Sequence, residues 1–355
     1  MNDSIRVLVL GTGQMGSGIA RLVLQKPGLQ LAGVYARRKE REGMDVGRVI
    51  GLDRDLGLHV ETNLESLLDR SRPHVAIQAT CSTVADATEE ISTLLHHGVH
   101  VISIAEEMAF PRYRSPGIAD KLEALALQHS AAVLGTGINP GFVLDLLIIT
   151  LTGVCADVQV ISAQRINDLA PYGPSVLATQ GVGLTPQDFE KGIESGAVVG
   201  HIGFTESIHM IASALGWTID RIEEERNPII SKVFRETPFV VVQPGQVAGC
   251  LHRAVAYRGD QAVVTLNHPQ QIHPHLEGVE TGDVIEITGT PNLRLAGTPE
   301  IPGGVGTCAL AVNTIPRVIN ARPGLYSMAD LPVPAAILGD VRKLLFKGVV
   351  KTSHG

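Results

Sequence analysis

The chain opens with the stretch that decides its fold, Ile5-Arg6-Val7-Leu8-Val9-Leu10-Gly11-Thr12-Gly13-Gln14-Met15-Gly16. An apolar, β-prone run ends in the pattern G-x-G-x-x-G, and a helical periodicity begins directly after it. This is the order required for a strand, a phosphate-binding turn and a helix. In such a turn Gly11 permits the sharp bend, Gly13 lets a pyrophosphate approach the backbone, and Gly16 lets the helix pack closely on the strand. The opening stretch therefore predicts a dinucleotide site.

The N-terminus of the first expected helix is suited to an anion, because its N–H groups are free and carry partial positive charge. We expect the residues of the turn to hold the cofactor, namely Gly11, Thr12, Gly13, Gln14, Met15 and Gly16. A plain strand–turn–helix without a ligand is the alternative interpretation, because glycine pairs also mark ordinary turns.

The end of the second expected strand, Leu29–Ala36, is where such a site contacts the adenosine ribose. An NAD-preferring site has an acidic residue there, about 20 residues past the glycines. This chain has Arg37 and Arg38 instead. Without a carboxylate a 2′-phosphate is not repelled, and guanidinium groups bind phosphate through two hydrogen bonds. We expect NADP to be preferred and NAD to be the second cofactor; the alternative is a pair of solvated loop arginines.

Length and composition describe an ordinary globular protein with two domains. The chain has 355 residues, 44% hydrophobic and 18% charged, and a domain takes roughly 150 residues. The net charge of −7, with no cluster of Lys and Arg, argues against nucleic-acid binding. No apolar run reaches about 18 residues, so we expect no membrane span. The opening residues Met1–Ser4 lack the features of a signal peptide, and we expect a cytoplasmic protein.

Cysteine and histidine usage argues against a metal site. The four cysteines are scattered and without metal-ligand spacing: Cys81, Cys155, Cys250 and Cys308. The thirteen histidines include no H-E-x-x-H motif and no compact Asp/His cluster. We therefore expect reduced thiols and no bound metal.

Polar side chains follow two further strands expected in the first domain. The segment Pro73–Thr80 leads into Thr80, Cys81 and Ser82, at a strand end where open α/β sheets bind ligands. The segment Val99–Ala105 is followed by two carboxylates, Glu106 and Glu107. Since neighbouring side chains on a strand point to opposite sides, one Glu faces the cofactor and the other is structural. Strand parity does not decide which Glu has which role.

A second glycine-rich turn, Gly135–Phe142, separates a strand from a helical pattern. Its spacing differs from G-x-G-x-x-G, and Pro140 removes one N–H donor. We interpret it as the crossover into the second domain, where Asn139 contacts the nicotinamide carboxamide and Phe142 the substrate. A structural hinge is the alternative.

Beyond about Asp157 the pattern changes to alternating strands, with helices expected at Pro186–Glu194, Ile208–Leu215 and Ile219–Glu225. The sequence thus predicts an α/β protein. An N-terminal Rossmann domain spans residues 1–141, and an α+β substrate-binding and dimerisation domain with a largely antiparallel sheet spans residues 142–305. The segment from about 306 to 355 packs back on the first domain, and a homodimer is expected.

Substrate contacts are expected from polar residues at turns and strand ends, namely Arg165, Tyr172, His201, Glu206, His268 and Thr307. For each histidine, a structural role with its hydrogen bonds satisfied is the commoner outcome.

Four segments together with the glycine motif carry a resemblance to a known family: Ile104–Pro111, Gly135–Phe142, Gly200–Ser207 and Val312–Pro316. Over nearly its whole length the chain resembles the 2,4-diaminopentanoate dehydrogenases and the related native amine dehydrogenases. These are distant relatives of dihydrodipicolinate reductase through the N-terminal domain.

The resemblance implies NAD(P)-dependent oxidative deamination of an amine, reversible as reductive amination of a ketone or aldehyde with ammonia. The family's essential carboxylate corresponds to Glu106 by a narrow margin over Glu107. Its pocket positions correspond to Phe142, Arg165, Tyr172, His268 and Thr307. A diamino acid would need a cation for its carboxylate, which Arg165 supplies, whereas a simple amine would not. Both substrates, 2,4-diaminopentanoate and a simple amine or ketone, remain open.

Three alternatives are retained. A dihydrodipicolinate reductase-like enzyme lacks support because that family's clustered histidines and lysine are absent. A sugar-type NADP oxidoreductase would have its catalytic lysine where Glu107 stands. A non-catalytic NADP-binding sensor would use the site for binding alone, and the pair of glutamates argues against it.

Overall fold

The computed structural model describes residues 4–346, so residues 1–3 and residues 347–355 of the expected C-terminal segment lie outside the described part. The chain divides into two compact units. The first unit combines the residues up to Phe142 with those from Gly303 onward, and the second is Val143–Pro302. Among residues 4–346, no helix combines the length and apolar character that a bilayer span requires. The cytoplasmic location stays a prediction.

The first unit is built on a seven-stranded sheet in the order β15-β6-β5-β4-β1-β2-β3, with every pairing parallel. Its strands are β1 (Ile5–Leu10), β2 (Leu29–Tyr35), β3 (Val60–Glu61), β4 (Val75–Gln78), β5 (His100–Ser103), β6 (Ala132–Gly135) and β15 (Gly324–Tyr326). The central strands are almost entirely buried, as expected for a parallel sheet covered on both faces. The predicted Rossmann architecture is confirmed.

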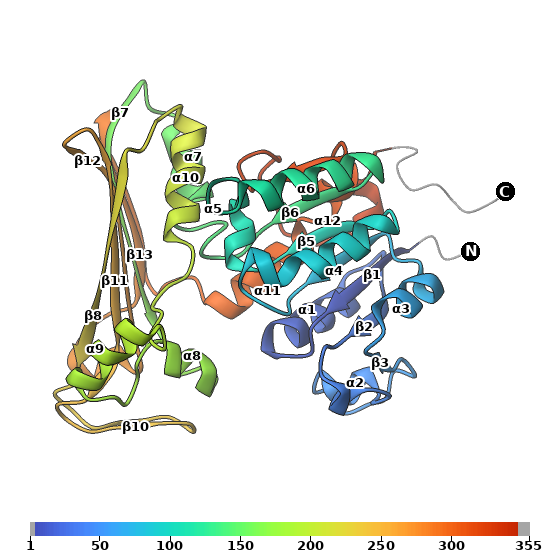
Figure 1. Ribbon diagram of the computed structural model, residues 1–355, viewed down its shortest axis with the longest axis horizontal. Coiled ribbons are helices and arrows are strands. Elements are labelled where there is room, and N and C mark those ends of the chain that lie inside the picture. Colours follow the sequence, from blue (N-terminus) through green and yellow to red (C-terminus); the bar gives the residue numbers. More distant parts are fainter. Residues whose placement is uncertain (1–3, 347–355) are drawn as a thin grey trace. The chain divides into compact units, whose positions relative to one another are not determined.

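Helices cover this sheet. They are α1 (Gln14–Gln25), α2 (Val46–Val49), α3 (Leu64–Ser71), α4 (Val84–His96), α5 (Pro111–Arg114), α6 (Pro116–Gln128), α11 (Gly303–Asn313) and α12 (Ile315–Asn320), with short 3₁₀ turns η1 (Lys39–Arg41), η2 (Glu106–Ala109) and η4 (Val341–Leu344). Helices α4 and α6 lie side by side and pack on β5 and β6, whereas α1 packs against α11 (Figure 1). The core between α4, α6 and the sheet includes Leu8, Ile91, Leu94 and Val101.

The edge strand β15 is the one element of this sheet that the sequence did not reveal. It has only three residues, and it pairs in parallel with β6, with Leu325 opposite Val133. A strand of three residues is too short to show an alternating pattern. Its place in the sheet depends on helices α11 and α12, which precede it in the chain and lead it to the edge of β6.

The second unit has a six-stranded sheet in the order β14-β13-β7-β12-β11-β8 and a small pair, β10-β9. Its strands are β7 (Asp157–Asp168), β8 (Arg221–Ile230), β9 (Arg235–Glu236), β10 (Val241–Val242), β11 (Val247–Arg258), β12 (Gln261–Gln271), β13 (Gly282–Thr290) and β14 (Leu293–Gly297). Its helices are α7 (Leu146–Thr152), α8 (Pro174–Thr179), α9 (Pro186–Ser195), α10 (Phe204–Leu215) and the 3₁₀ turn η3 (Pro274–Glu277). Only the β7–β12 pairing is parallel, which confirms the largely antiparallel sheet.

The helix expected at Ile219–Glu225 is wrong, because this segment enters the edge strand β8. Exposure alternates along it: Glu223 and Glu225 are exposed, whereas Ile222 and Glu224 are partly covered. Antiparallel pairing with β11 over the strand's whole length decides the conformation. Four charged residues in a row concealed the two-residue period that identifies a half-buried strand.

Candidate active site

The three motif glycines meet different surroundings. A Cβ on Gly11 would lie 2.4 Å from the carbonyl oxygen of Ala79, and one on Gly16 would lie 2.1 Å from the carbonyl oxygen of Gly11. A Cβ on Gly13 would meet nothing within 4 Å. Gly11 and Gly16 are thus required by packing, whereas Gly13 borders open space at the start of α1, where no described side chain caps the helix. These residues fit a bound pyrophosphate.

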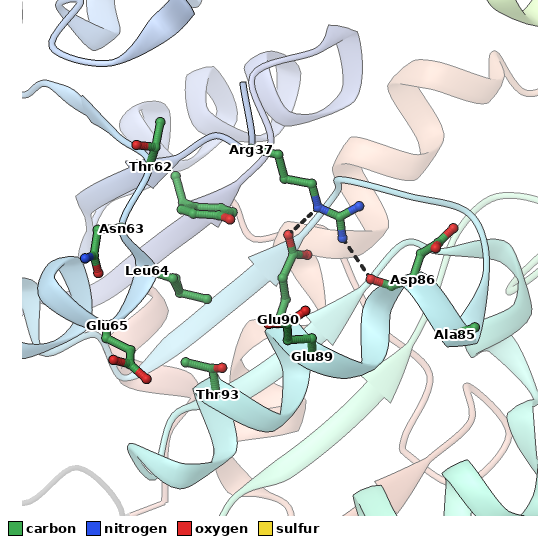
Figure 2. Close-up of a pocket in the computed structure, with 11 residues that line it drawn as sticks. Arg37, Thr62, Asn63, Leu64, Glu65, Ala85, Asp86, Glu89, Glu90 and Thr93 are labelled. Atoms are coloured by element: carbon green, nitrogen blue, oxygen red, sulfur yellow. Dashed lines mark hydrogen bonds and ion pairs between the residues drawn. The ribbon is translucent and has the colours of Figure 1, made fainter. Parts of the chain in front are cut away.

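Arg37, which follows β2, turns toward helix α4. Its Nε donates to the carboxylate of Glu90 at 2.7 Å and its Nη2 to the carbonyl oxygen of Asp86 at 2.8 Å (Figure 2). The carboxylate of Glu90 raises the pKa of Arg37, so the guanidinium stays charged. Arg38, the other arginine expected at the ribose, is exposed at the start of η1. The two arginines therefore differ: Glu90 compensates the charge of Arg37, and Arg38 lies in solvent.

The pocket beside Arg37 is acidic. It measures about 650 Å³ and lies between the end of β2, the segment before α3 and the first turns of α4. Figure 2 shows Glu65, Asp86, Glu89 and Glu90 around it, with Arg37 as the cation among its lining residues. Carboxylates accept hydrogen bonds from ribose hydroxyls and repel a phosphate.

A buried hydrogen-bond network ends at Glu90. Its second carboxylate oxygen accepts from the hydroxyl of Thr80 at 2.5 Å and from the amide of Gln78 at 3.3 Å. The Gln78 carbonyl accepts from the hydroxyl of Ser103 at 2.6 Å. The amide of Gln78 also contacts the thiol of Cys81, whose pKa is raised by burial. The predicted contact residues Thr80 and Cys81 thus use their polar groups within the protein.

The two glutamates follow β5 in the 3₁₀ turn η2, so the parity of a strand does not apply to them. The carboxylate of Glu107 accepts the backbone N–H of Val84, the first residue of α4, at 2.8 Å. The pKa of Glu106 is raised, with burial as the largest cause; the charge of Glu107 adds to the shift and a hydrogen bond with Ser82 opposes it. Glu107 therefore anchors the turn, and Glu106 has the proton affinity of a candidate acid–base group.

The second glycine-rich turn lies beside η2. A Cβ on Gly135 would fall 1.7 Å from the carbonyl oxygen of Met108, so only glycine lets η2 pack on the end of β6. The backbone N–H of Ile138 donates to the hydroxyl of Thr307 on α11 at 3.2 Å. Asn139 and Phe142, later in the turn, are partly buried. The hydroxyl of Thr136 is buried and has no partner among residues 4–346, a feature that a single sequence does not reveal.

In the second unit, histidines form a buried cluster. The rings of His201 and His268 lie 4.8 Å apart, and the backbone N–H of His201 donates to Nδ1 of His252 at 3.0 Å. The Nε2 atom of His268 lies 2.9 Å from the side-chain oxygen of Asn167. Burial lowers the pKa of His201 to about 3, helped by His252 and Arg165, so its ring is neutral at pH 7.

His252 and Asn167 in this cluster were missed from sequence. Only the pairing of β11 with β12 and of β12 with β7 brings them beside His268. The Nε2 atom of His201 is buried and has no hydrogen-bond partner in the described part of the chain.

The other substrate candidates of the second unit have structural partners. Arg165 is 2% exposed, and its outer nitrogens donate to Asp283 at 2.6 Å and to the carbonyl oxygen of Ile301 at 2.5 Å. Tyr172 packs at the edge of a small apolar cluster, and burial raises its pKa. Glu206 is buried in the first turn of α10. Arg165 thus carries a charge that is already compensated by Asp283.

The expectation of no compact Asp/His cluster requires correction. Asp168, His273 and His275 offer ligand atoms that all lie within 4.8 Å of one another. The parallel pairing of β7 with β12 places Asp168 opposite Gln271, two residues before the first histidine. Asp168 and His273 are 105 residues apart along the chain, so no motif of closely spaced residues reveals this cluster.

A parallel sheet with a glycine-lined helix start, and a half-buried carboxylate just after β5 of the same sheet, are the features of a nicotinamide-dependent dehydrogenase. The chain belongs to the 2,4-diaminopentanoate dehydrogenase family. Residues 142–347 match the family model "2,4-diaminopentanoate dehydrogenase C-terminal domain", and residues 5–104 match "Dihydrodipicolinate reductase, N-terminus".

Individual relatives agree with this assignment. The chain is 40% identical over 344 residues to a 2,4-diaminopentanoate dehydrogenase of Acetoanaerobium sticklandii, covering 97% of this chain and 98% of the relative. It is 26% identical over 363 residues to an amine dehydrogenase of Streptomyces virginiae, covering 94% and 98%. The solved structure of an amine dehydrogenase from Mycobacterium smegmatis matches with a TM-score of 0.82 and 28% identity, covering 92% and 96% of the two chains.

The glycines allow a matched test of the cofactor site. Gly16→Ala inserts a methyl group against backbone and should destabilise the protein by about 1–3 kcal/mol in denaturant unfolding. Gly13→Ala points into open space and should cost under about 1 kcal/mol, yet weaken dinucleotide binding at least tenfold. Fluorescence titration with NADH and NADPH measures the second effect. Unchanged dinucleotide binding by Gly13→Ala would contradict the site.

Proposed function

We propose that the protein is an NAD(P)-dependent amine dehydrogenase. It deaminates 2,4-diaminopentanoate or a simple amine oxidatively, and in reverse it aminates a ketone or aldehyde with ammonia. The observation that carries the proposal is Glu106, a half-buried carboxylate of raised pKa just after β5, in a chain 40% identical to a 2,4-diaminopentanoate dehydrogenase.

Glu106 supplies the acid–base chemistry in this proposal. Its carboxylate accepts a proton from the ammonium form of the substrate amine, which leaves a neutral amine whose nitrogen lone pair stabilises the iminium that forms on the substrate as the hydride departs. When bound, the nicotinamide ring supplies the hydride acceptor. Water then adds to the substrate iminium, and ammonia leaves as the carbonyl forms, with Glu106 returning the proton. Glu107 is a positioning residue, because its hydrogen bond to Val84 fixes the turn that carries Glu106.

The remaining predicted contacts divide between the two units. In the first unit the turn residues Gly11–Gly16 hold the pyrophosphate, Ser82 and Asn139 contact the nicotinamide half, and Phe142 and Thr307 contact the substrate. In the second unit the candidates are His201, His268 and Tyr172, and a homodimer formed through this unit's sheet is part of the proposal.

The choice of substrate depends on Arg165. A diamino acid brings a carboxylate, and Arg165 would have to share its charge between that carboxylate and Asp283. The 40% sequence identity to a 2,4-diaminopentanoate dehydrogenase favours the diamino acid as substrate. The charge of Arg165, already compensated by Asp283, favours a simple amine or ketone as substrate. Both are therefore assayed.

The first test is dependence on ammonia. Purified protein with NADPH or NADH and a panel of small ketones and aldehydes should consume the reduced cofactor only when ammonia is present. In the other direction it should reduce NAD(P) with 2,4-diaminopentanoate or a simple amine. Turnover without ammonia would indicate a carbonyl or sugar reductase, and tight NADPH binding without any turnover would indicate a sensor.

The second test separates the two glutamates. Glu106→Gln should abolish turnover, by at least about a hundredfold for loss of an acid–base group, and leave cofactor affinity nearly unchanged. In the wild type, kcat/KM for amine oxidation should fall as pH drops through a pKa raised above the ordinary range of Glu, because protonated Glu106 cannot accept the amine proton. Glu107→Gln should retain turnover and move this pH midpoint to lower pH, because it removes a negative charge that raises the pKa of Glu106. If only Glu107→Gln abolishes turnover, the assignment is reversed.

The third test concerns the 2′-phosphate, for which we propose that NADP is preferred and NAD accepted. Arg38 is exposed and has no ion pair among the described residues, whereas Arg37 is paired with Glu90. Losing a charged hydrogen bond of about 1.5–3 kcal/mol, Arg38→Ala should bind NADPH roughly ten- to a hundredfold more weakly and NADH almost unchanged. The control is Arg48→Ala, an exposed arginine of α2. Equal affinity of the wild type for both cofactors would overturn the preference and indicate that the acidic lining governs the site.

A further inference from the structure

Asp168, His273 and His275 form a cluster of ligand atoms outside the proposed catalytic residues. Asp168 ends β7, His273 follows β12, and His275 lies in η3. Their carboxylate and ring nitrogen atoms lie within 4.8 Å of one another. Two imidazoles and one carboxylate are the ligand types that first-row divalent metals bind.

The ring of His273 is oriented like that of a metal ligand. Its Nε2 lies 2.8 Å from the carbonyl oxygen of Glu236, a contact that requires the hydrogen on Nε2. The neutral ring then presents the lone pair of Nδ1 to the second carboxylate oxygen of Asp168 at 4.0 Å. Two electron-rich atoms that face each other are stabilised by a cation between them. A backbone carbonyl that holds the other ring nitrogen is the usual outer support of a ligating histidine.

The loop that carries both histidines is held in place before any metal binds. The buried side chain of Arg235 donates to the carbonyl oxygens of Ile272 and His273 and forms an ion pair with Glu277. His273 itself has a left-handed backbone, with φ of 48°. A non-glycine residue in this region is held there by its surroundings.

Asp168 has one oxygen free for a ligand role. Its first carboxylate oxygen accepts the backbone N–H groups of Ala170 at 2.8 Å and His273 at 2.9 Å. These two bonds fix the carboxylate and leave the second oxygen directed at the histidine ring. The arrangement is therefore a fixed pair of ligands, Asp168 and His273, with the exposed His275 as the third.

We propose that Asp168, His273 and His275 bind a divalent transition metal ion, of which Zn²⁺ is the best match. Zinc takes nitrogen and carboxylate oxygen ligands at about 2.0–2.2 Å, which in a tetrahedron are roughly 3.4 Å apart. The 4.0 Å between Nδ1 and the Asp168 oxygen needs only a small closure, and His275 closes by rotating its ring. The fourth position is left to water. Mg²⁺ and Ca²⁺ do not fit this site, because both ions prefer a coordination shell made of oxygen atoms alone.

The metal would join the end of β7 to the loop after β12. Tyr172, a substrate candidate, follows Asp168 by four residues, so the ion stabilises the segment that leads to it. This role is structural and independent of the proposed dehydrogenase activity. A ligand that binds only the folded state raises the stability of the protein by mass action.

The test uses the full-length protein after removal of metals with a chelator. Zn²⁺ is titrated in competition with a chromophoric chelator, Co²⁺ binding is followed by its visible absorption, and melting is followed with and without Zn²⁺. We expect one Zn²⁺ per chain, a tetrahedral Co²⁺ spectrum and a higher melting temperature with Zn²⁺. His275→Gln should lower Zn²⁺ affinity at least tenfold and remove the melting shift, and His273→Gln should do the same.

The matched control is His59→Gln, an exposed histidine of the first unit, which should bind Zn²⁺ like the wild type. Because His275 is exposed, its variant should have the circular dichroism spectrum of the wild type. The proposal is overturned if the wild type binds Zn²⁺ no more tightly than His275→Gln, or if Co²⁺ keeps the spectrum of the aqueous ion.

Discussion

One buried carboxylate, that of Glu90 on α4, holds together the ends of strands β2 and β4. The residue is 6% exposed, and a charge removed from water costs several kcal/mol unless it is paired and hydrogen-bonded. Arg37, Thr80 and Gln78 provide that compensation from the ends of β2 and β4. The ends of these strands are therefore fixed relative to α4.

The same network reaches the 3₁₀ turn η2. Ser103, the last residue of β5, donates its hydroxyl to Gln78 and accepts the backbone N–H of Ala105 at 3.2 Å. Ala105 directly precedes Glu106. A continuous set of hydrogen bonds thus runs from Arg37, just after β2, to the turn that carries the candidate acid–base group. This network fixes the ends of β2, β4 and β5 relative to one another and to Glu106.

Sequence patterns predicted the parts of this structure that depend on short stretches of chain. The glycine turn, the alternating strands and helices of the first unit, and the change to a largely antiparallel sheet all have local signals. Glu90 has none, because it is 53 residues from Arg37 and resembles any solvated charge on a helix. The strand β8 and the contact of Asp168 with His273 likewise depend on partners distant in sequence. These features depend on pairing between residues far apart in the chain, and such pairing leaves no local pattern in a single sequence.

The charges of the candidate substrate contacts in the second unit indicate which group transfers the proton in the proposed reaction. Burial keeps His201 neutral at pH 7 and lowers the pKa of His268 in the same direction. Arg165 is neutralised by Asp283. These candidate substrate contacts therefore offer hydrogen bonds and shape without uncompensated positive charge. Such groups do not repel an ammonium group, whereas an added cation beside an amine would oppose the positive iminium. The proton transfer is left to Glu106, whose raised pKa makes it a stronger base than an exposed carboxylate.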